Sequence, residues 1–177
     1  MMVWFNLLGY QLVWFLLVIG AARGDLLFAL LAATLFVLVQ TIVSAQPWRE
    51  LRLIGVAMLL GVVIDGVASA TGWLSYASSS PALPPHGAPL WIVMLWACFA
   101  TTINRSLKIV QRHPRWAALI GGIGAPAAYL AAERGWHAVT LQPLSGLLWI
   151  GVGWAVALPL MAVLGRRWLH PWEARRA

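Results

Sequence analysis

Charged residues are scarce in this sequence. They make up 10% of its 177 residues, and only five of them are acidic. Hydrophobic residues make up 62% of the chain. The sequence therefore lacks the polar surface that a soluble domain of this size needs to stay dispersed in water, and its composition predicts an integral membrane protein.

Cysteine is also scarce, and the common catalytic motifs are absent from the sequence. The single cysteine, Cys98, has no partner for a disulfide and stands in no pattern of metal ligands. Phosphate-binding loops, dinucleotide fingerprints, haem-attachment motifs and zinc-binding helices do not occur. One aspartate within the apolar runs is too few for a metal-dependent phosphotransferase, and an intramembrane serine protease needs a histidine there. The sequence predicts no metal site and indicates no cofactor.

Long apolar runs are what the sequence has in abundance. A helix needs about 20 mostly apolar residues to cross the hydrocarbon core of a bilayer. Runs of that kind cover residues 3–22, 26–44, 51–71, 89–107, 116–132 and 144–165. They lack the alternation of outer-membrane strands, and a helix satisfies its own backbone hydrogen bonds in lipid. We therefore predict an all-α transmembrane bundle of about six helices, forming a single domain over residues 1–177.

The basic residues fall mostly on one side of these predicted helices. This side holds Arg49, Arg52, Arg105, Lys108, Arg112, Arg115, Arg166, Arg167, Arg175 and Arg176. The other side holds only Arg23 and Arg134, each near an acidic residue. The positive-inside rule therefore predicts that both termini are cytoplasmic.

The same placement of charge bears on partners. Membrane orientation and attraction to anionic headgroups account for the net charge of +7 better than nucleic-acid binding does. We expect membrane lipid as a partner, no nucleic acid, and a multi-pass location in a bacterial inner membrane. The sequence indicates no particular protein partner.

Tryptophan is abundant, with twelve residues. Because an amphipathic indole favours the membrane interface, tryptophans at the ends of the apolar runs are expected there. These are Trp4, Trp48, Trp73, Trp91, Trp116, Trp136 and Trp168.

One connection, residues 72–88, is much longer than the others and is rich in serine and proline. It follows the third apolar run, on the side that has few basic residues. Connections of this length are uncommon within compact domains. The segment is either a lid or a connector stiffened by proline.

Asp65 is the one carboxylate well inside an apolar run. An aspartate at the centre of a spanning helix costs about 2.5 to 3.5 kcal/mol on insertion scales, and such residues are candidates for function. Gly61 and Ala68 share its helical face and leave room for a helix, a ligand or water. Tyr129 falls at nearly the same depth and could donate a hydrogen bond to Asp65. Asp65 and Tyr129 are the candidate catalytic residues, and a purely structural role for Asp65 stays open.

A second set of polar residues comes level nearer the predicted cytoplasmic face, at a rise of about 1.5 Å per residue. Its members are Asn6, Tyr10, Gln11, Gln40, Thr101, Asn104 and Arg105. The set is either a ligand-binding cluster or a group of hydrogen bonds between helices, each worth about 0.6 kcal/mol. The sequence does not separate these alternatives.

Four patterns carry a resemblance to a known family. They are N-x-x-x-Y-Q-x-x-W at 6–14, G-x-x-x-D at 61–65, APLWIVMLWACFATTINRSL at 88–107 and P-x-x-Y at 126–129. Together they resemble an uncharacterised family of small polytopic proteobacterial inner-membrane proteins, a domain of unknown function. The resemblance covers nearly the whole chain. It implies no assigned activity, and a gene neighbourhood of fatty-acid-modifying functions.

The resemblance also bears on metal binding. Relatives often carry histidine at the positions of Arg105 and Gln40. A metal role there would not carry over to this chain, which has neither histidine.

Three functional hypotheses follow, and the sequence does not decide whether the chain is an enzyme. The leading one is a lipid-associated membrane enzyme or accessory factor, because polar groups lie within the predicted spans. The alternative is a small-molecule binding or transport subunit, since the size and topology resemble the membrane components of vitamin importers. The third is a structural scaffold in which the polar groups hold helices together.

Overall fold

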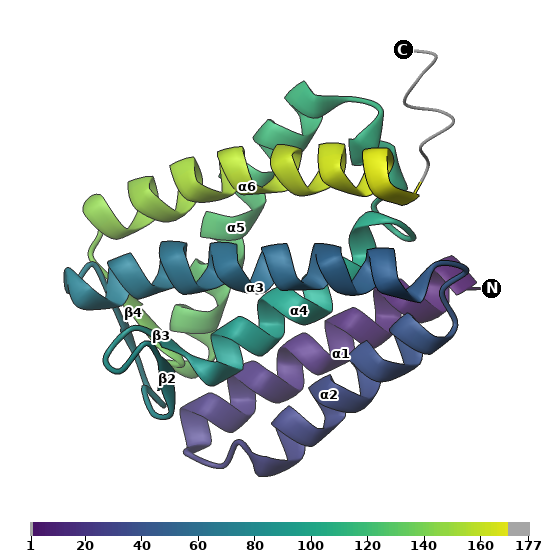
Figure 1. Cartoon of the computed structure of the whole chain (residues 1–177). Coiled ribbons are helices and arrows are strands. Elements are labelled where there is room, and N and C mark those ends of the chain that lie inside the picture. Colours follow the sequence, from purple (N-terminus) through teal and green to yellow (C-terminus); the bar gives the residue numbers. More distant parts are fainter. Residues whose placement is uncertain (1, 170–177) are drawn as a thin grey trace.

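The computed structural model describes residues 2–169 and confirms the predicted all-α bundle of six helices (Figure 1). The helices are α1 (Met2–Arg23), α2 (Leu27–Ile42), α3 (Pro47–Ala70), α4 (Leu90–Ile103), α5 (Pro114–Trp136) and α6 (Ser145–Leu169). A 3-10 turn, η1 (Lys108–Gln111), lies between α4 and α5. Each helix overlaps one of the six apolar runs.

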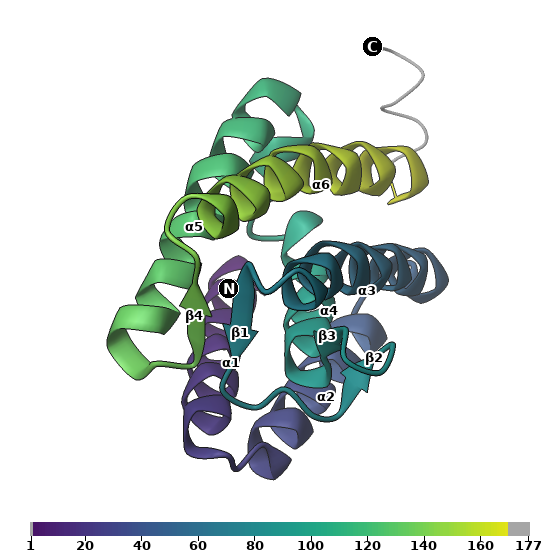
Figure 2. The same cartoon turned by 90° about the vertical axis from the view of Figure 1, so that its left-hand side faces the viewer.

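The helices pack mainly in three pairs, α1 with α2, α3 with α4, and α5 with α6. Helix α5 is steeply inclined to α6 and runs from the level of α6 down to the strands (Figures 1 and 2). The third pair joins the second through α6, which packs along α3, whereas α5 touches α1 only sparsely. The indole N–H of Trp149 on α6 also donates to the Ile64 carbonyl of α3, at 2.8 Å.

Local sequence explains where several helices begin and end. Pro47 and Pro114 open α3 and α5, where the missing N–H of proline costs nothing. Gly24 and Gly72 follow α1 and α3 with φ of 72° and 71°, a conformation that glycine adopts without strain.

Three of the described helices are long and apolar enough to cross a membrane. They are Val3–Arg23, Pro47–Ala70 and Ser145–Trp168. The apolar helices Leu27–Ile42 and Leu90–Ile103 are shorter, with 16 and 14 residues. Helix α5 has 23 residues but carries charged side chains near both ends. A crossing by α2, α4 and α5 therefore stays a prediction.

The outer surface of the bundle is apolar. Phe28 and Ile42 of α2 are each 75% exposed, and Val152 and Val156 of α6 are also exposed. A soluble monomer seldom exposes contiguous apolar surface of this extent, whereas hydrocarbon covers it without cost. The apolar helices and this surface indicate contact with a membrane.

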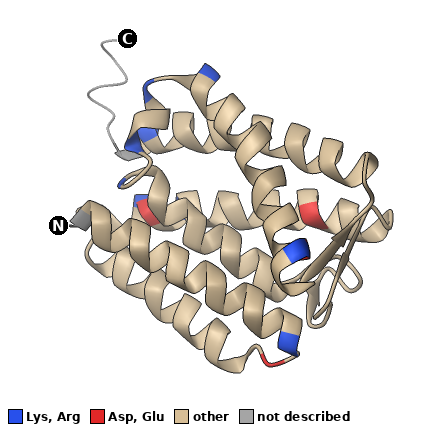
Figure 3. Cartoon of the chain, turned by 180° about the vertical axis from the view of Figure 1, so that it is seen from behind, with Lys and Arg blue, Asp and Glu red and all other residues tan. Residues whose placement is uncertain are grey.

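Basic residues gather at the end of the bundle that holds the start of α1 and the end of α6 (Figure 3). Trp4, Trp48 and Trp116 lie in the first turns of α1, α3 and α5 and are exposed, as expected for an interface. Arg175 and Arg176 lie outside the described residues. The prediction for Trp91 is wrong, because Trp91 is buried and its indole N–H donates to the Ser78 carbonyl at 3.0 Å.

The opposite end of the bundle is closed by a small folded cap. The long connection forms β1 (Leu74–Tyr76), β2 (Ala82–Leu83) and β3 (Ala88–Pro89), and β4 (Val139–Leu141) lies between α5 and α6. Strand β1 pairs antiparallel with β4, and β2 with β3 (Figure 2). The Ser78 hydroxyl ties the cap to α1 by donating to the Ala21 carbonyl at 2.8 Å. The connection is thus an ordered part of the fold.

Candidate functional site

Asp65 lies at the centre of a hydrogen-bond cage formed by three aromatic side chains. Its carboxylate is fully buried. The hydroxyls of Tyr76 and Tyr129 both donate to Oδ1, the former at 2.8 Å. The indole N–H of Trp96 donates to Oδ2, also at 2.8 Å. The contact between Asp65 and Tyr129 expected from depth is present, and the cage joins α3, β1, α4 and α5 through one carboxylate.

The cage depends on a close approach between α3 and α4. A Cβ atom at Gly61 would overlap the indole ring of Trp96. Glycine at position 61 thus leaves the space that Trp96 occupies. The ring of Trp96 stacks in turn on Trp154 of α6, with ring centroids 4.0 Å apart.

Tyr76 is the cage member contributed by the cap. Its side chain is 8% exposed. Burial, followed by the nearby charge of Asp65, raises the pKa of the Tyr76 hydroxyl well above its ordinary value. The hydroxyl therefore keeps its proton and stays a donor at neutral pH. The cap is anchored to the membrane helix α3 through this bond.

Next to the cage lies a cavity of about 470 Å³, partly open to the outside of the bundle. Side chains of α1, α4, α5 and α6 form most of its wall. Helix α5 contributes small residues, namely Gly121, Gly124, Ala125, Ala128, Ala131 and Ala132. The facing wall is rich in aromatic and aliphatic side chains, and none of the described residues that line the cavity is charged. Its size is within the range of small-molecule sites.

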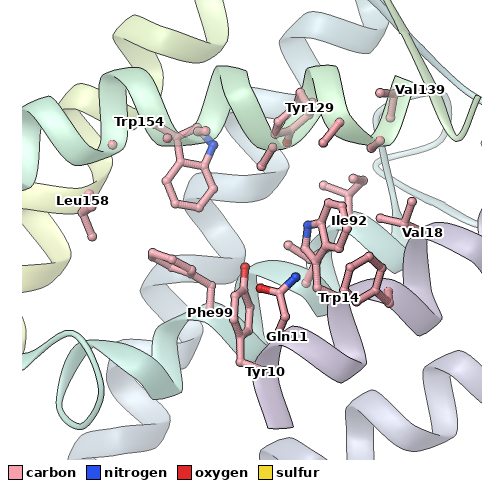
Figure 4. A pocket seen from close by; sticks show the side chains of 18 of the residues that line it. Tyr10, Gln11, Trp14, Val18, Ile92, Phe99, Tyr129, Val139, Trp154 and Leu158 are labelled. Carbon is pink, nitrogen blue, oxygen red and sulfur yellow. The ribbon is translucent and has the colours of Figure 1, made fainter. Parts of the chain in front are cut away.

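Seven side chains with a polar group line this cavity (Figure 4). They are Tyr10, Gln11 and Trp14 of α1, Trp91 of α4, Tyr129 and Trp136 of α5, and Trp154 of α6. The Trp154 indole N–H is buried and acts as a donor toward the Tyr129 hydroxyl, although not at ideal hydrogen-bond geometry. Polar groups are thus present on two sides of an otherwise apolar space.

The second predicted set of polar residues does not form one cluster. Tyr10 and Gln11 line the cavity. Asn6 instead bonds to α4 and its C-terminal turn: its amide donates to Thr101, and its Oδ1 accepts from the Ser106 hydroxyl at 2.7 Å. These bonds fix α1 against α4, as in the helix-packing alternative.

Gln40 and Arg105 do lie together, but as a structural contact. The Arg105 guanidinium donates to the Gln40 backbone carbonyl at 2.9 Å. This bond gives a hydrogen-bond donor to a carbonyl near the C-terminal end of α2, where helical carbonyls lack partners in their own helix.

Asn104 contacts a residue that the sequence reasoning passed over. Its amide donates to Glu50 at 3.2 Å, and its Oδ1 accepts from Gln111 at 2.6 Å. Glu50 is 2% exposed, although it stands between two arginines in a segment that resembles a solvated connection. A small residue, Gly165 of α6, passes close to Asn104 and Gln111. The chain Glu50–Asn104–Gln111 thus joins α3, α4 and η1 under α6.

The geometry separates the carboxylate from the cavity. Asp65 is enclosed by its three donors and does not line the cavity, whereas Tyr129 touches both. Within residues 2–169, no three His, Cys, Asp or Glu side chains gather as a metal site would require. The arrangement can hold a largely apolar molecule and form hydrogen bonds with a polar group of that molecule through uncharged side chains.

Residues 3–160 match the family described as "Protein of unknown function (DUF2878)". No curated protein and no solved structure matches the chain significantly. Since the match covers most of the 177 residues, the chain belongs to the DUF2878 family.

Proposed function

We propose that this protein is a multi-pass membrane protein that binds a lipid-like molecule in the cavity between α1, α4, α5 and α6. The cavity of about 470 Å³ is the observation that carries the proposal. An engineered protein cavity of about 150 Å³ holds one benzene molecule, so this space suits a molecule of roughly three such rings in volume.

The surroundings of the cavity favour a ligand that arrives from the bilayer. The helices that form its wall have apolar outer surfaces, and α5 meets α1 only sparsely. Small side chains along α5 leave the space between these helices unfilled. A hydrophobic molecule can therefore pass from lipid into the cavity without crossing water.

An accessory role in lipid metabolism agrees better with this geometry than catalysis by Asp65. A general acid or base has to reach the reacting atoms. Asp65 is surrounded by donors, with Tyr129 between it and the cavity. We assign the cage to positioning Tyr129, Trp96 and the cap around the cavity.

The orientation belongs to the same proposal. The basic end of the bundle faces the cytoplasm of a bacterial cell, and the cap faces the outside of the inner membrane. The exposed tryptophans at the basic end support an interfacial position for that end. A reporter that is active only in the cytoplasm should be active when it is fused to the carboxyl end. Export of that end would contradict the orientation.

Native mass spectrometry of the protein purified in mild detergent tests the binding proposal. We expect one bound lipid-like molecule on the wild type. Gly124→Leu places a side chain at the cavity, where a Cβ meets no neighbour within 4 Å, and should abolish retention. Gly55→Leu is the matched control, since its Cβ also has open space and Gly55 does not line the cavity. Absence of any adduct, or equal retention by all three proteins, would refute the proposal.

A further inference from the structure

We infer that the molecule held in this cavity carries an uncharged carbonyl group within an apolar body, and that the carbonyl oxygen accepts hydrogen bonds from Tyr10 and Gln11 of α1. The inference rests on the proposed binding function and adds the chemical class of the ligand. It is carried by polar side chains that face the cavity and make no hydrogen bond within the described chain.

Tyr10 supplies a donor that the described chain does not use. The hydroxyls of Tyr76 and Tyr129 both donate to Asp65, whereas the Tyr10 hydroxyl makes no hydrogen bond to any described residue. The Tyr10 ring packs edge-on against Phe99 of α4, with ring centroids 5.7 Å apart. This contact holds the ring at the cavity wall, so that its hydroxyl points into the cavity (Figure 4).

Gln11 presents its amide beside this hydroxyl (Figure 4). Its side chain is exposed and makes no hydrogen bond to the rest of the described chain. Gln11 lies nine residues after the start of α1 at Met2, or about 14 Å along the helix, which is near the middle of a hydrocarbon core of about 30 Å. Hydrocarbon offers an amide no partner at that depth. A polar group of a molecule in the cavity can supply one.

The polar groups that α1 places on this wall are mainly donors. Tyr10 contributes an O–H and Gln11 an NH₂ group. The indole N–H of Trp14, one turn further along α1, is another donor that makes no hydrogen bond to a described residue. A carbonyl oxygen has two lone pairs and brings no proton of its own, so one such oxygen accepts from Tyr10 and Gln11 together. A hydrocarbon leaves both donors without a partner.

The charge and shape of the wall narrow the class of ligand further. None of the described residues that line the cavity is charged, and an anion buried without a partner costs far more than a hydrogen-bonded carbonyl. Apolar side chains lie on both sides of the polar pair: Phe99 and Leu158 toward the basic end, and Val18 and Val139 toward the cap (Figure 4). The carbonyl therefore lies between two apolar parts of the ligand, as in a long-chain ketone or ester.

Three probes with the same number of carbon atoms test the inference: dioctyl ketone, heptadecane and heptadecanoate. Their fractional occupancy on the delipidated protein in detergent is measured by native mass spectrometry over a titration. We expect the ketone to bind the wild type about fivefold to thirtyfold more tightly than the other two, the size of one or two net hydrogen bonds.

Two variants locate the contact. Tyr10→Phe removes the hydroxyl and keeps the ring against Phe99, and Gln11→Leu removes the amide. Each should lower the preference for the ketone over heptadecane by about fivefold, and the double variant should abolish it. Gln142→Leu is the matched control, because Gln142 is also exposed but lies outside the cavity wall, and it should keep the wild-type preference.

The outcomes distinguish the inference from the binding function on which it rests. Equal binding of the ketone and heptadecane to the wild type, or tightest binding of heptadecanoate, would overturn the carbonyl contact and leave the binding function intact. An unchanged preference in the double variant would overturn the assignment to Tyr10 and Gln11. If no probe binds and no molecule co-purifies with the protein, the binding function itself fails. The comparison among probes uses the wild-type protein and does not depend on how well a variant folds.

Discussion

Removal of the Asp65 carboxylate gives the most direct test of the cage. Asp65→Ala leaves the donors of Tyr76, Tyr129 and Trp96 without their common acceptor. Hydrogen bonds between helices in membrane proteins contribute about 0.6 kcal/mol on average and up to about 1.7 kcal/mol. Three bonds therefore predict a loss of roughly 2 to 5 kcal/mol in the free energy of unfolding.

The assay is reversible unfolding in mixed micelles of mild detergent and dodecyl sulfate, followed by circular dichroism. Tyr76→Phe removes one of the three bonds and should cost about 0.6 to 1.7 kcal/mol. Asp25→Ala is the control, since Asp25 is exposed in the turn after α1 and should change stability by less than about 0.5 kcal/mol. In the double variant Asp65→Ala/Tyr76→Phe, the second substitution should add almost nothing. If Asp65→Ala costs no more than Asp25→Ala, the carboxylate does not hold the cage together.

Two further predictions concern the same region. Gly61→Ala should lower the free energy of unfolding by about 1 to 3 kcal/mol, because its new methyl group displaces the Trp96 ring. Gly55→Ala is the control and should be neutral or stabilising, since Gly55 has open space around it. Equal effects of the two substitutions in thermal melts would count against the close packing. The raised pKa of Tyr76 predicts that its stabilising effect is fully present below pH about 10, the ordinary pKa of tyrosine, and is lost as the pH rises through the folded-state value. Between pH about 9 and 11, wild type should therefore lose more stability than Tyr76→Phe, and parallel losses would show that the hydroxyl is not held in the cage.

The sequence predicts the helices and one pair of contacting residues in the site, for clear physical reasons. Few folds are possible in lipid for apolar runs of spanning length, so six helices are expected from the composition. Asp65 and Tyr129 could be matched because rise per residue fixes depth along straight helices. Depth does not fix rotation about the helix axis, and so Tyr10 and Gln11 were grouped with Asn6, although they line the cavity.

The remaining cage members depend on tertiary structure. Tyr76 reaches Asp65 only because the connection after α3 pairs with β4, more than sixty residues later in the chain. Trp96 stands within an apolar run and carries no local signal of a polar contact, although Gly61 opposite it is the kind of small residue that admits a large neighbour. Glu50 stands between two arginines, and its burial has no local signal.

An experimental structure of the wild-type protein in lipid nanodiscs tests the central claim most directly. We expect non-protein density inside the cavity, continuous with the bilayer between α1 and α5. A bundle in which α1 and α5 close together and side chains fill this space would contradict the claim that the protein binds a molecule from the membrane.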